Sequence, residues 1–155
     1  MSRTSNRPVD WEALVTENET RLYRAALAIL GHPQEAEDAV QDAFIRYLEK
    51  APADLENPGA WLTRVLVNGC KSRLRLGWRR VGPLPDTLPT PGPEEREELE
   101  ELFALPPEDR AVIHLHYYEG YSTDEIARML GCRPGTVRSR LSRARGRLRK
   151  LIEAN

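Results

Sequence analysis

GYSTDEIARMLGCRPGTVRSRLSRARGRLRKLI, residues 120–152, predicts two helices joined by a tight turn. Ser122 is followed three residues later by Glu125, the capping-box spacing that satisfies free amide groups at the start of a helix. Gly131 favours the end of that helix, and Pro134 suits the first position of the next one. The pair forms a helix-turn-helix, in which the second helix can enter the major groove of DNA.

The second of these helices is strongly basic. Residues 133–150 hold eight Arg or Lys and no Asp or Glu. Arg is the commonest reader of guanine and Ser can bond several base edges. We therefore expect base contacts from the side chains off the apolar seam near its start, Arg138, Ser139, Ser142 and Arg143, and phosphate contacts from the other bases, Arg140, Arg145, Arg147, Arg149 and Lys150. A solvated basic face or an acidic protein partner is the plainer alternative, and position 133 carries Arg where Ser or Asp would cap the helix better.

The composition places this basic end in an otherwise balanced chain. The 155 residues carry a formal net charge of -1, so acidic segments must offset it, and residues 93–101 alone hold six Glu. Cys70 and Cys132 are far apart and lack the paired spacing of a zinc or redox site. The sequence has no signal-peptide core and no apolar run of membrane-spanning length. We expect a cytoplasmic protein with reduced thiols.

Three further helices are predicted before residue 80. Apolar residues at helical spacing indicate a helix from residue 11 to 30, with a break near residues 17–20 left open, and a second one from Pro33 through Leu48. Asn57 and Pro58 supply a cap and a first turn for the third. Residues 81–93 contain five prolines, which predicts an extended linker. The protein is therefore expected to be all-α, with small helical domains at residues 1–80 and 95–155 joined by a Pro-rich linker at 81–94.

The second and third helices carry opposite charges on their polar faces. The second exposes an acidic series: Glu35, Glu37, Asp38, Gln41, Asp42 and Glu49. The third carries a basic one, Arg64, Asn68, Lys71 and Arg75, continued by Arg73, Arg79 and Arg80. Ordinary solubility would explain the acids, and a solvated helix face would explain Asn68. Two partners of opposite charge are the functional alternative.

Three segments together resemble a known family. AEDAVQDAF (residues 36–44), AWLTRVLVN (60–68) and the terminal GYSTDEIARMLGCRPGTVRSRLSRAR are similar to conserved regions 2 and 4 of bacterial sigma factors. The order and spacing resemble the extracytoplasmic-function (ECF) group of the sigma-70 family, over about residues 11–80 and 105–152. The resemblance implies a subunit that binds core RNA polymerase, recognises the -35 and -10 promoter elements, and helps to open the DNA.

The resemblance also implies roles for residues. It implies that core polymerase is bound, at the clamp helices of its largest subunit, by Glu37, Asp38, Gln41 and Asp42. It implies that the -10 element is contacted by Arg64, Asn68, Lys71, Arg73 and Arg75, with Asn68 holding a base flipped from the duplex, and by the loop at residues 53–59. It implies that the -35 element is contacted by Arg138, Ser139, Arg140, Ser142 and Arg143. The polymerase flap is a further implied contact, and family members are often held by an anti-sigma factor.

Other function classes find less support in the sequence. A stand-alone helix-turn-helix regulator remains the alternative to a sigma factor. No phosphate loop, nucleophile elbow or metal-hydrolase motif is present, so we expect no enzyme and no cofactor. His114 and His116 are two residues apart without a third ligand, so no metal site is expected. Trp78 has no assigned role.

Overall fold

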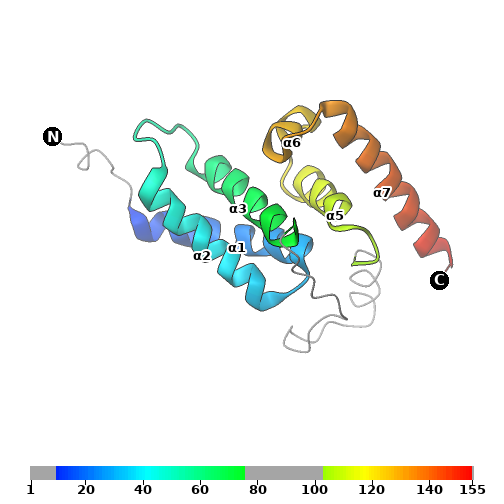
Figure 1. The fold of residues 1–155 in the computed structure, drawn as a ribbon, viewed down its shortest axis with the longest axis horizontal. Helices are drawn as coiled ribbons and strands as arrows, with labels where there is room; N and C mark the ends of the chain where they lie inside the picture. The colour runs from blue at the N-terminus through cyan, green and yellow to red at the C-terminus, as the bar shows by residue number, and fades with distance from the viewer. Residues whose placement is uncertain (1–9, 76–102, 155) are drawn as a thin grey trace.

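The computed structural model describes residues 10–75 and 103–154, without the side chains of Leu151, Ile152 and Ala154. Every regular element in these residues is helical (Figure 1): α1 Trp11–Leu30, α2 Pro33–Lys50, α3 Pro58–Arg75, α5 Pro107–Ile113, the π-helix η2 His114–Tyr118, α6 Thr123–Leu130 and α7 Pro134–Ala154. The all-α prediction is confirmed. The predicted linker, the acidic residues 93–101, Trp78, Arg79 and Arg80 lie outside the described residues.

Helix α1 is continuous through the region where a break was left open. The Asp10 side chain accepts a hydrogen bond from the Ala13 amide at its start, and Gly31 ends it with a φ of 71°. Asn18 lies in the middle and is buried, and its side-chain amide donates to the Leu14 carbonyl at 2.8 Å. Because this polar side chain bonds within its own helix, it can face the interior without interrupting α1.

Helices α1, α2 and α3 form a three-helix bundle with an aromatic row along it. Trp11 packs edge-on against Phe44 at 5.8 Å between ring centroids, and Tyr47 packs edge-on against Trp61 at 5.6 Å. The fully buried aliphatic side chains include Leu22, Ile29, Leu62 and Leu66. Edge-to-face pairs and complete aliphatic burial are each stabilising, so this bundle has a substantial core of its own.

The predicted helix-turn-helix is confirmed in α6 and α7. Both capping-box bonds form: the Ser122 amide donates to Glu125 Oε1 at 2.8 Å, and the Glu125 amide donates to Ser122 Oγ at 3.1 Å. Gly131 ends α6 with a φ of 71°. Arg133, where a capping side chain was missing, accepts bonds from the Thr136 and Val137 amides through its carbonyl. The seam of α7 is buried at Val137, Leu141 and Ala144.

The two halves of the chain pack directly against each other. Helix α5 lies against α1, and α6 lies against α3 (Figure 1). Buried apolar residues form one continuous cluster, from Leu14 in α1 to Ala144 in α7. The described chain is therefore closed, with the helix-turn-helix resting on the three-helix bundle.

Candidate functional site

The polar face of α2 carries an exposed acidic strip, defined here as Glu37, Asp38, Gln41 and Asp42. Glu37, Gln41 and Asp42 are exposed and Asp38 is half-buried. Glu35, expected on the same face, is instead buried at 8% exposure, with a carboxylate oxygen 3.9 Å from His32 Nδ1. It lies in the first turn of α2, where its charge also favours the helix N-terminus.

Two apolar side chains are exposed farther along the same helix. Leu48, which the helical spacing placed in the core, is 66% exposed, and Ile45 is 50% exposed. The bundle still covers this part of α2, because the preceding Tyr47 is 5% exposed and packs on Trp11 and Trp61, so Leu48 lies at the uncovered edge of the apolar stripe. The exposure of Ile45 could have been predicted from the sequence, because this apolar residue lies off the buried stripe of α2 and among charged residues.

The basic face of α3 is only partly available. Arg64, Asn68 and Arg75 are exposed. Lys71 is half-buried and donates through Nζ to the carbonyl of Leu130, at the end of α6. Arg73 Nη2 lies 2.9 Å from Asp42 Oδ2 of the acidic strip. The residues predicted for one partner therefore touch those predicted for the other at the Asp42–Arg73 pair.

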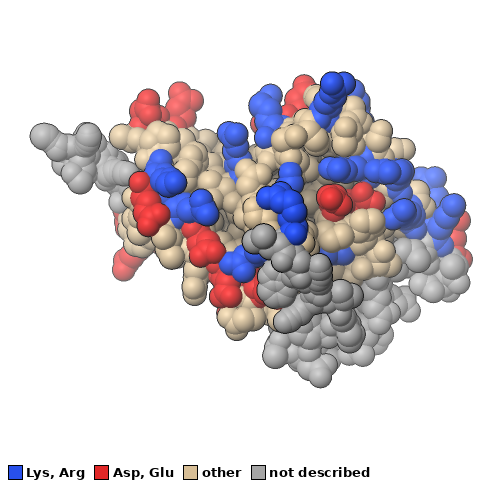
Figure 2. Space-filling model, viewed as in Figure 1, with Lys and Arg blue, Asp and Glu red and all other residues tan. Residues whose placement is uncertain are grey.

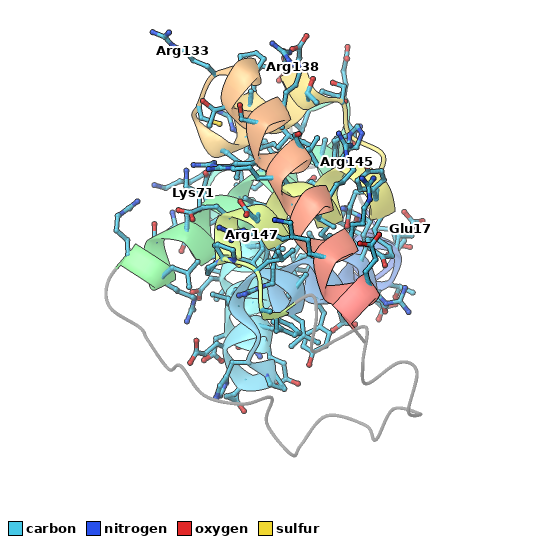
Figure 3. All side chains as sticks on the ribbon, turned by 90° about the vertical axis from the view of Figure 1, so that its right-hand side faces the viewer. Glu17, Lys71, Arg133, Arg138, Arg145 and Arg147 are labelled. Atoms are coloured by element: carbon cyan, nitrogen blue, oxygen red, sulfur yellow. The ribbon has the colours of Figure 1, made fainter. Side chains whose placement is uncertain are left out.

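Helix α7 presents the predicted reading face to the outside. Arg138, Ser139, Ser142 and Arg143 are exposed and Arg140 is half-buried. Lys and Arg side chains cover much of the side of the molecule that carries α7 (Figure 2). Figure 3 shows Arg133 and Arg138 toward one end of this helix and Arg145 and Arg147 farther along it. This arrangement suits a helix that enters a DNA groove at its start and contacts phosphates along its length.

Two of the later arginines also have partners within the protein. Arg145 donates to the Tyr117 hydroxyl, and Arg147 Nη1 lies 3.9 Å from Asp109 Oδ2. Both arginines remain exposed, so these contacts orient their side chains without removing them from the surface.

The histidines of η2 have structural partners. His114 Nε2 lies 3.3 Å from Glu119 Oε2, and His116 Nδ1 lies 2.9 Å from the Tyr121 carbonyl. Burial raises the pKa of the Glu119 carboxyl, but hydrogen bonds from His114 and Arg21 outweigh burial and leave it below its usual value. Across residues 10–75 and 103–154, no group of three or more metal-binding side chains is assembled.

The cysteine in α3 is protected from reaction. Cys70 is fully buried, and burial raises the pKa of its thiol to about 12, although the charge of Arg73 opposes that rise. Cys132 is half-buried in the turn between α6 and α7. Within the described residues, no helix combines the length and the apolar composition that crossing a bilayer requires.

Sequence reasoning also missed three charged residues, Arg21, Arg110 and Glu119, which join the two halves. Arg21 Nη1 lies 2.8 Å from Glu119 Oε1, and Arg110 donates to backbone carbonyls at the end of α1. Single charged positions on amphipathic helices carry no local pattern that indicates such long-range partners.

Comparison with known protein families identifies sigma-factor regions 2 and 4 in this chain, in the order that the sequence resemblance implied. The model of Sigma-70 region 2 matches residues 14–80, and that of Sigma-70, region 4 matches residues 96–148. The ECF RNA polymerase sigma factor SigE of Mycolicibacterium smegmatis is 36% identical over 160 residues, covering 92% of this chain and 61% of SigE. The ECF RNA polymerase sigma factor SigM of Mycobacterium tuberculosis is 33% identical over 150 residues, covering 92% of this chain and 76% of SigM.

Solved structures share the arrangement of both halves. The sigma factor RpoE of Bartonella quintana, in complex with the anti-sigma factor NepR, superposes with a TM-score of 0.78 at 26% identity, covering 94% of this chain and 98% of that one. CnrH, in complex with the cytosolic domain of CnrY, gives a TM-score of 0.65 at 27% identity and covers 94% and 88% of the two chains. The relatives favour a sigma factor over a stand-alone regulator. The chain belongs to the extracytoplasmic-function group of the sigma-70 family of RNA polymerase sigma factors.

Proposed function

We propose that the chain docks on core RNA polymerase through the acidic strip of α2 and directs it to promoters, with α7 reading the -35 element and α3 holding the melted -10 element. In this proposal residues 1–80 form region 2, residues 95–155 form region 4, and residues 81–94 link them. The chain itself performs no catalysis and works in the cytoplasm, where the polymerase transcribes. The observation that carries the proposal is an exposed acidic helix face beside two separate basic ones in a member of this family.

The acidic strip suits a basic partner surface. Glu37, Gln41 and Asp42 are exposed, so a partner surface can reach them, although Asp42 is also paired with Arg73 at 2.9 Å. Opposite charge across an interface speeds association and fixes its register. Ile45 and Leu48 add exposed apolar area on the same helix, which the strip needs for affinity because exposed ion pairs alone contribute little. The clamp helices of the largest subunit are the proposed docking site, with the flap as the contact of region 4.

The basic face of α3 suits a single strand held by its backbone. Arg64, Asn68 and Arg75 are exposed on one helix, with Lys71 and Arg73 between or beside them. Taking a base out of the stack costs a few kcal/mol, which phosphate contacts and a polar side chain that bonds the base can offset. We assign the base contact to Asn68 and the strand contacts to the surrounding cations.

Helix α7 suits duplex DNA. Its exposed Arg138, Ser139, Ser142 and Arg143 lie in the half that follows the turn, where a recognition helix contacts base edges. Arg140 belongs to the same proposed -35 contact. An anti-sigma factor is a candidate partner, because the similar sigma factor RpoE was solved in complex with the anti-sigma factor NepR.

Charge reversal on the acidic strip tests this proposal. Asp38→Lys is preferable to a change at Asp42, because Asp42 also pairs with Arg73 of the -10 face. We expect at least about tenfold weaker binding to core polymerase, since a like charge at an interface costs more than the 1.4 kcal/mol of a tenfold loss. Binding of the isolated chain to a -35 duplex should not change.

Glu19→Lys is the matched control, because it makes the same charge change at an exposed position of α1. Fluorescence anisotropy with labelled core polymerase measures the affinity, and run-off transcription measures initiation. If Asp38→Lys binds core and supports specific initiation as well as Glu19→Lys, the acidic strip is not the docking surface.

A further inference from the structure

The guanidinium of Arg21 joins two helices of the three-helix bundle. Its Nη2 donates to Asn18 Oδ1 at 2.7 Å and to the Gly59 carbonyl at 3.2 Å, and its Nη1 donates to Thr63 Oγ1 at 2.5 Å. The side-chain nitrogen of Asn18 donates to the Leu14 carbonyl, which leaves the side-chain oxygen to accept from Arg21. Helices α1 and α3 are therefore bridged at Arg21 by hydrogen bonds within the bundle.

The Gly59 peptide of α3 is held by the same cluster. A Cβ at this position would lie 3.1 Å from Asn18 Oδ1 and 3.3 Å from Arg21 Nη2, closer than ordinary van der Waals contact, so glycine leaves the space that these side chains need. Thr63 Oγ1 also donates to the Gly59 carbonyl, at 2.9 Å. Because two side chains donate to this one carbonyl, the orientation of its peptide plane is fixed.

The cluster lies where the loop at residues 53–59 enters α3. Asn57 caps the helix, because its Oδ1 accepts from the Ala60 amide at 3.0 Å. Leu55, in the middle of the loop, packs against the core, whereas its neighbours Asp54 and Glu56 are exposed. The exposed part of the loop is thus held on both sides, and the anchor on the side of α3 includes Arg21.

The charge of Arg21 does not by itself explain its position. The start of a helix carries partial positive charge, so a cation is disfavoured there, and the first turn of α3 has no acidic residue to offset it. Glu119 pairs with Arg21 Nη1 at 2.8 Å, but Nη2 bonds only within the bundle, to Asn18 and Gly59. The planar guanidinium, with its donors in fixed directions, is therefore used to place acceptors from two helices.

We propose that Arg21 is a positioning residue for the -10 element, which holds the start of α3 and the loop at residues 53–59 in the conformation that receives the melted strand. Ordering a loop backbone costs conformational entropy, so a loop that is held before DNA arrives loses less on binding. In this role Arg21 does not touch DNA. The inference rests on the proposed assignment of α3 and the loop before it to the -10 element.

The variants isolate the bonds that Arg21 makes within the bundle. Arg21→Gln and Arg21→Lys are each combined with Glu119→Gln, so that no buried carboxylate loses an ion pair. The matched control is Arg24→Gln with Glu119→Gln, because Arg24 is an exposed arginine of the same helix and this control has the net charge of the Arg21→Gln variant. Lysine keeps the charge but not the planar fork, so Arg21→Lys should not restore the function.

Thr63→Val perturbs the same cluster without changing Arg21. Valine has the shape of threonine but lacks the hydroxyl that bonds both Arg21 and the Gly59 carbonyl, and Thr63 is fully buried. This variant keeps the test decisive if the Arg21 variants do not fold. Circular dichroism verifies the helix content of every variant.

Base preference of the holoenzyme is the measurement. Core polymerase with each variant is bound to forked duplexes whose single-stranded -10 segment has random sequence, and the bound molecules are sequenced. The parent and the control should enrich particular bases. Enrichment should fall about fivefold or more in both Arg21 variants, the discrimination that one well-placed base contact supplies, and less in Thr63→Val. A role in stability alone would reduce the amount of active protein and leave the base preference of that protein unchanged.

Hydrogen-exchange mass spectrometry on the free chains gives a second result that needs no DNA. The amides of residues 53–60 should exchange faster in the Arg21 variants than in the control. Unchanged exchange there, base enrichment in the Arg21 variants or in Thr63→Val equal to that of the parent, or a control that also loses its preference would each overturn the positioning role. A parent holoenzyme that enriches no base would instead contradict the assignment of α3 and the loop to the -10 element.

Discussion

The α1–α3 half and the α5–α7 half differ in how far each can stabilise itself. Helices α1, α2 and α3 have 20, 18 and 18 residues, whereas in the second half only α7, with 21 residues, is long, and α5, η2 and α6 have 7, 5 and 8. Isolated helices shorter than about 12–15 residues are marginal in water, so the short elements depend on tertiary packing. The first half buries an aromatic row, but Tyr117 and Tyr118 of the second are 52% and 77% exposed.

The difference indicates that the helix-turn-helix gains stability from the bundle beneath it. Helix α5 packs against both α7 and α1, and Arg110 satisfies the last carbonyls of α1 from the second half. The long helix α7, which carries the exposed basic face, is thereby supported from one side and open on the other. Helix α7 packs on α5 and α6, which in turn pack on α1 and α3, so the reading surface can be repositioned when the contacts with α1 and α3 are lost.

A core substitution in the first half gives the largest expected effect. Leu66 of α3 is 1% exposed, so Leu66→Ala should lower the free energy of unfolding by about 3 kcal/mol through lost burial and a residual cavity. Because the buried cluster is continuous, we also expect faster hydrogen exchange at the amides of α6. Urea denaturation and hydrogen-exchange mass spectrometry measure the two effects.

Leu48→Ala is the control for that substitution, since it removes the same atoms from a side chain that is 66% exposed and should change stability by less than about 0.5 kcal/mol. Unchanged protection of α6 in Leu66→Ala would mean that the halves unfold independently. The inference that the α5–α7 half depends on the α1–α3 half for its stability would then be wrong.

An arginine on the recognition helix gives the next largest effect. Arg138→Ala should weaken binding of the holoenzyme to its -35 element by about 1–3 kcal/mol, because an arginine–guanine pair discriminates by that much. Arg64→Ala on α3, which we assign to strand contact, should lower affinity equally on any sequence. Competition binding with specific and scrambled duplexes separates the two outcomes.

Arg128→Ala, an exposed arginine on α6 outside the proposed face, controls for the loss of one positive charge. An equal loss for Arg138→Ala on scrambled DNA would place Arg138 on a phosphate. The basic residues of both halves would then contact DNA without distinguishing its sequence.

The helices and their caps could be predicted because their signals are local. The Ser122–Glu125 box, the glycine at position 131 and the proline at position 134 each act within a few residues, and each has the structural role that its spacing indicates. The exposed reading face of α7 follows from the same periodicity, since the seam fixes which side chains point outward.

The contacts between the halves could not be predicted in this way. Arg110 and Ala28 are 82 residues apart, and Arg21 and Glu119 are 98 residues apart. Each of these charged side chains reads locally as an ordinary helix-surface residue. The predictions that Leu48 is buried and Glu35 exposed were wrong for a related reason. Helical spacing predicts which face of a helix a residue lies on, but not how far the neighbouring helices cover that face.

The smallest expected effect concerns the Arg73–Asp42 ion pair, which joins the acidic strip to the basic face of α3. Side-chain exposure is 22% for Arg73 and 61% for Asp42, and exposed pairs of this kind contribute about 0.5 kcal/mol or less. Arg73→Gln and Asp42→Asn should therefore destabilise the chain slightly and to the same extent, since each breaks the same contact.

The effects of these two substitutions on binding should differ. Arg73→Gln should weaken capture of a -10 single strand and leave core affinity unchanged, whereas Asp42→Asn should weaken core binding and, because it frees Arg73, should not weaken strand capture. Anisotropy with labelled core polymerase and with a single-stranded -10 oligonucleotide measures both. If both variants weaken the same binding reaction, the acidic strip and the basic face of α3 act as a single site, because two surfaces with separate partners would not both be needed for one of them.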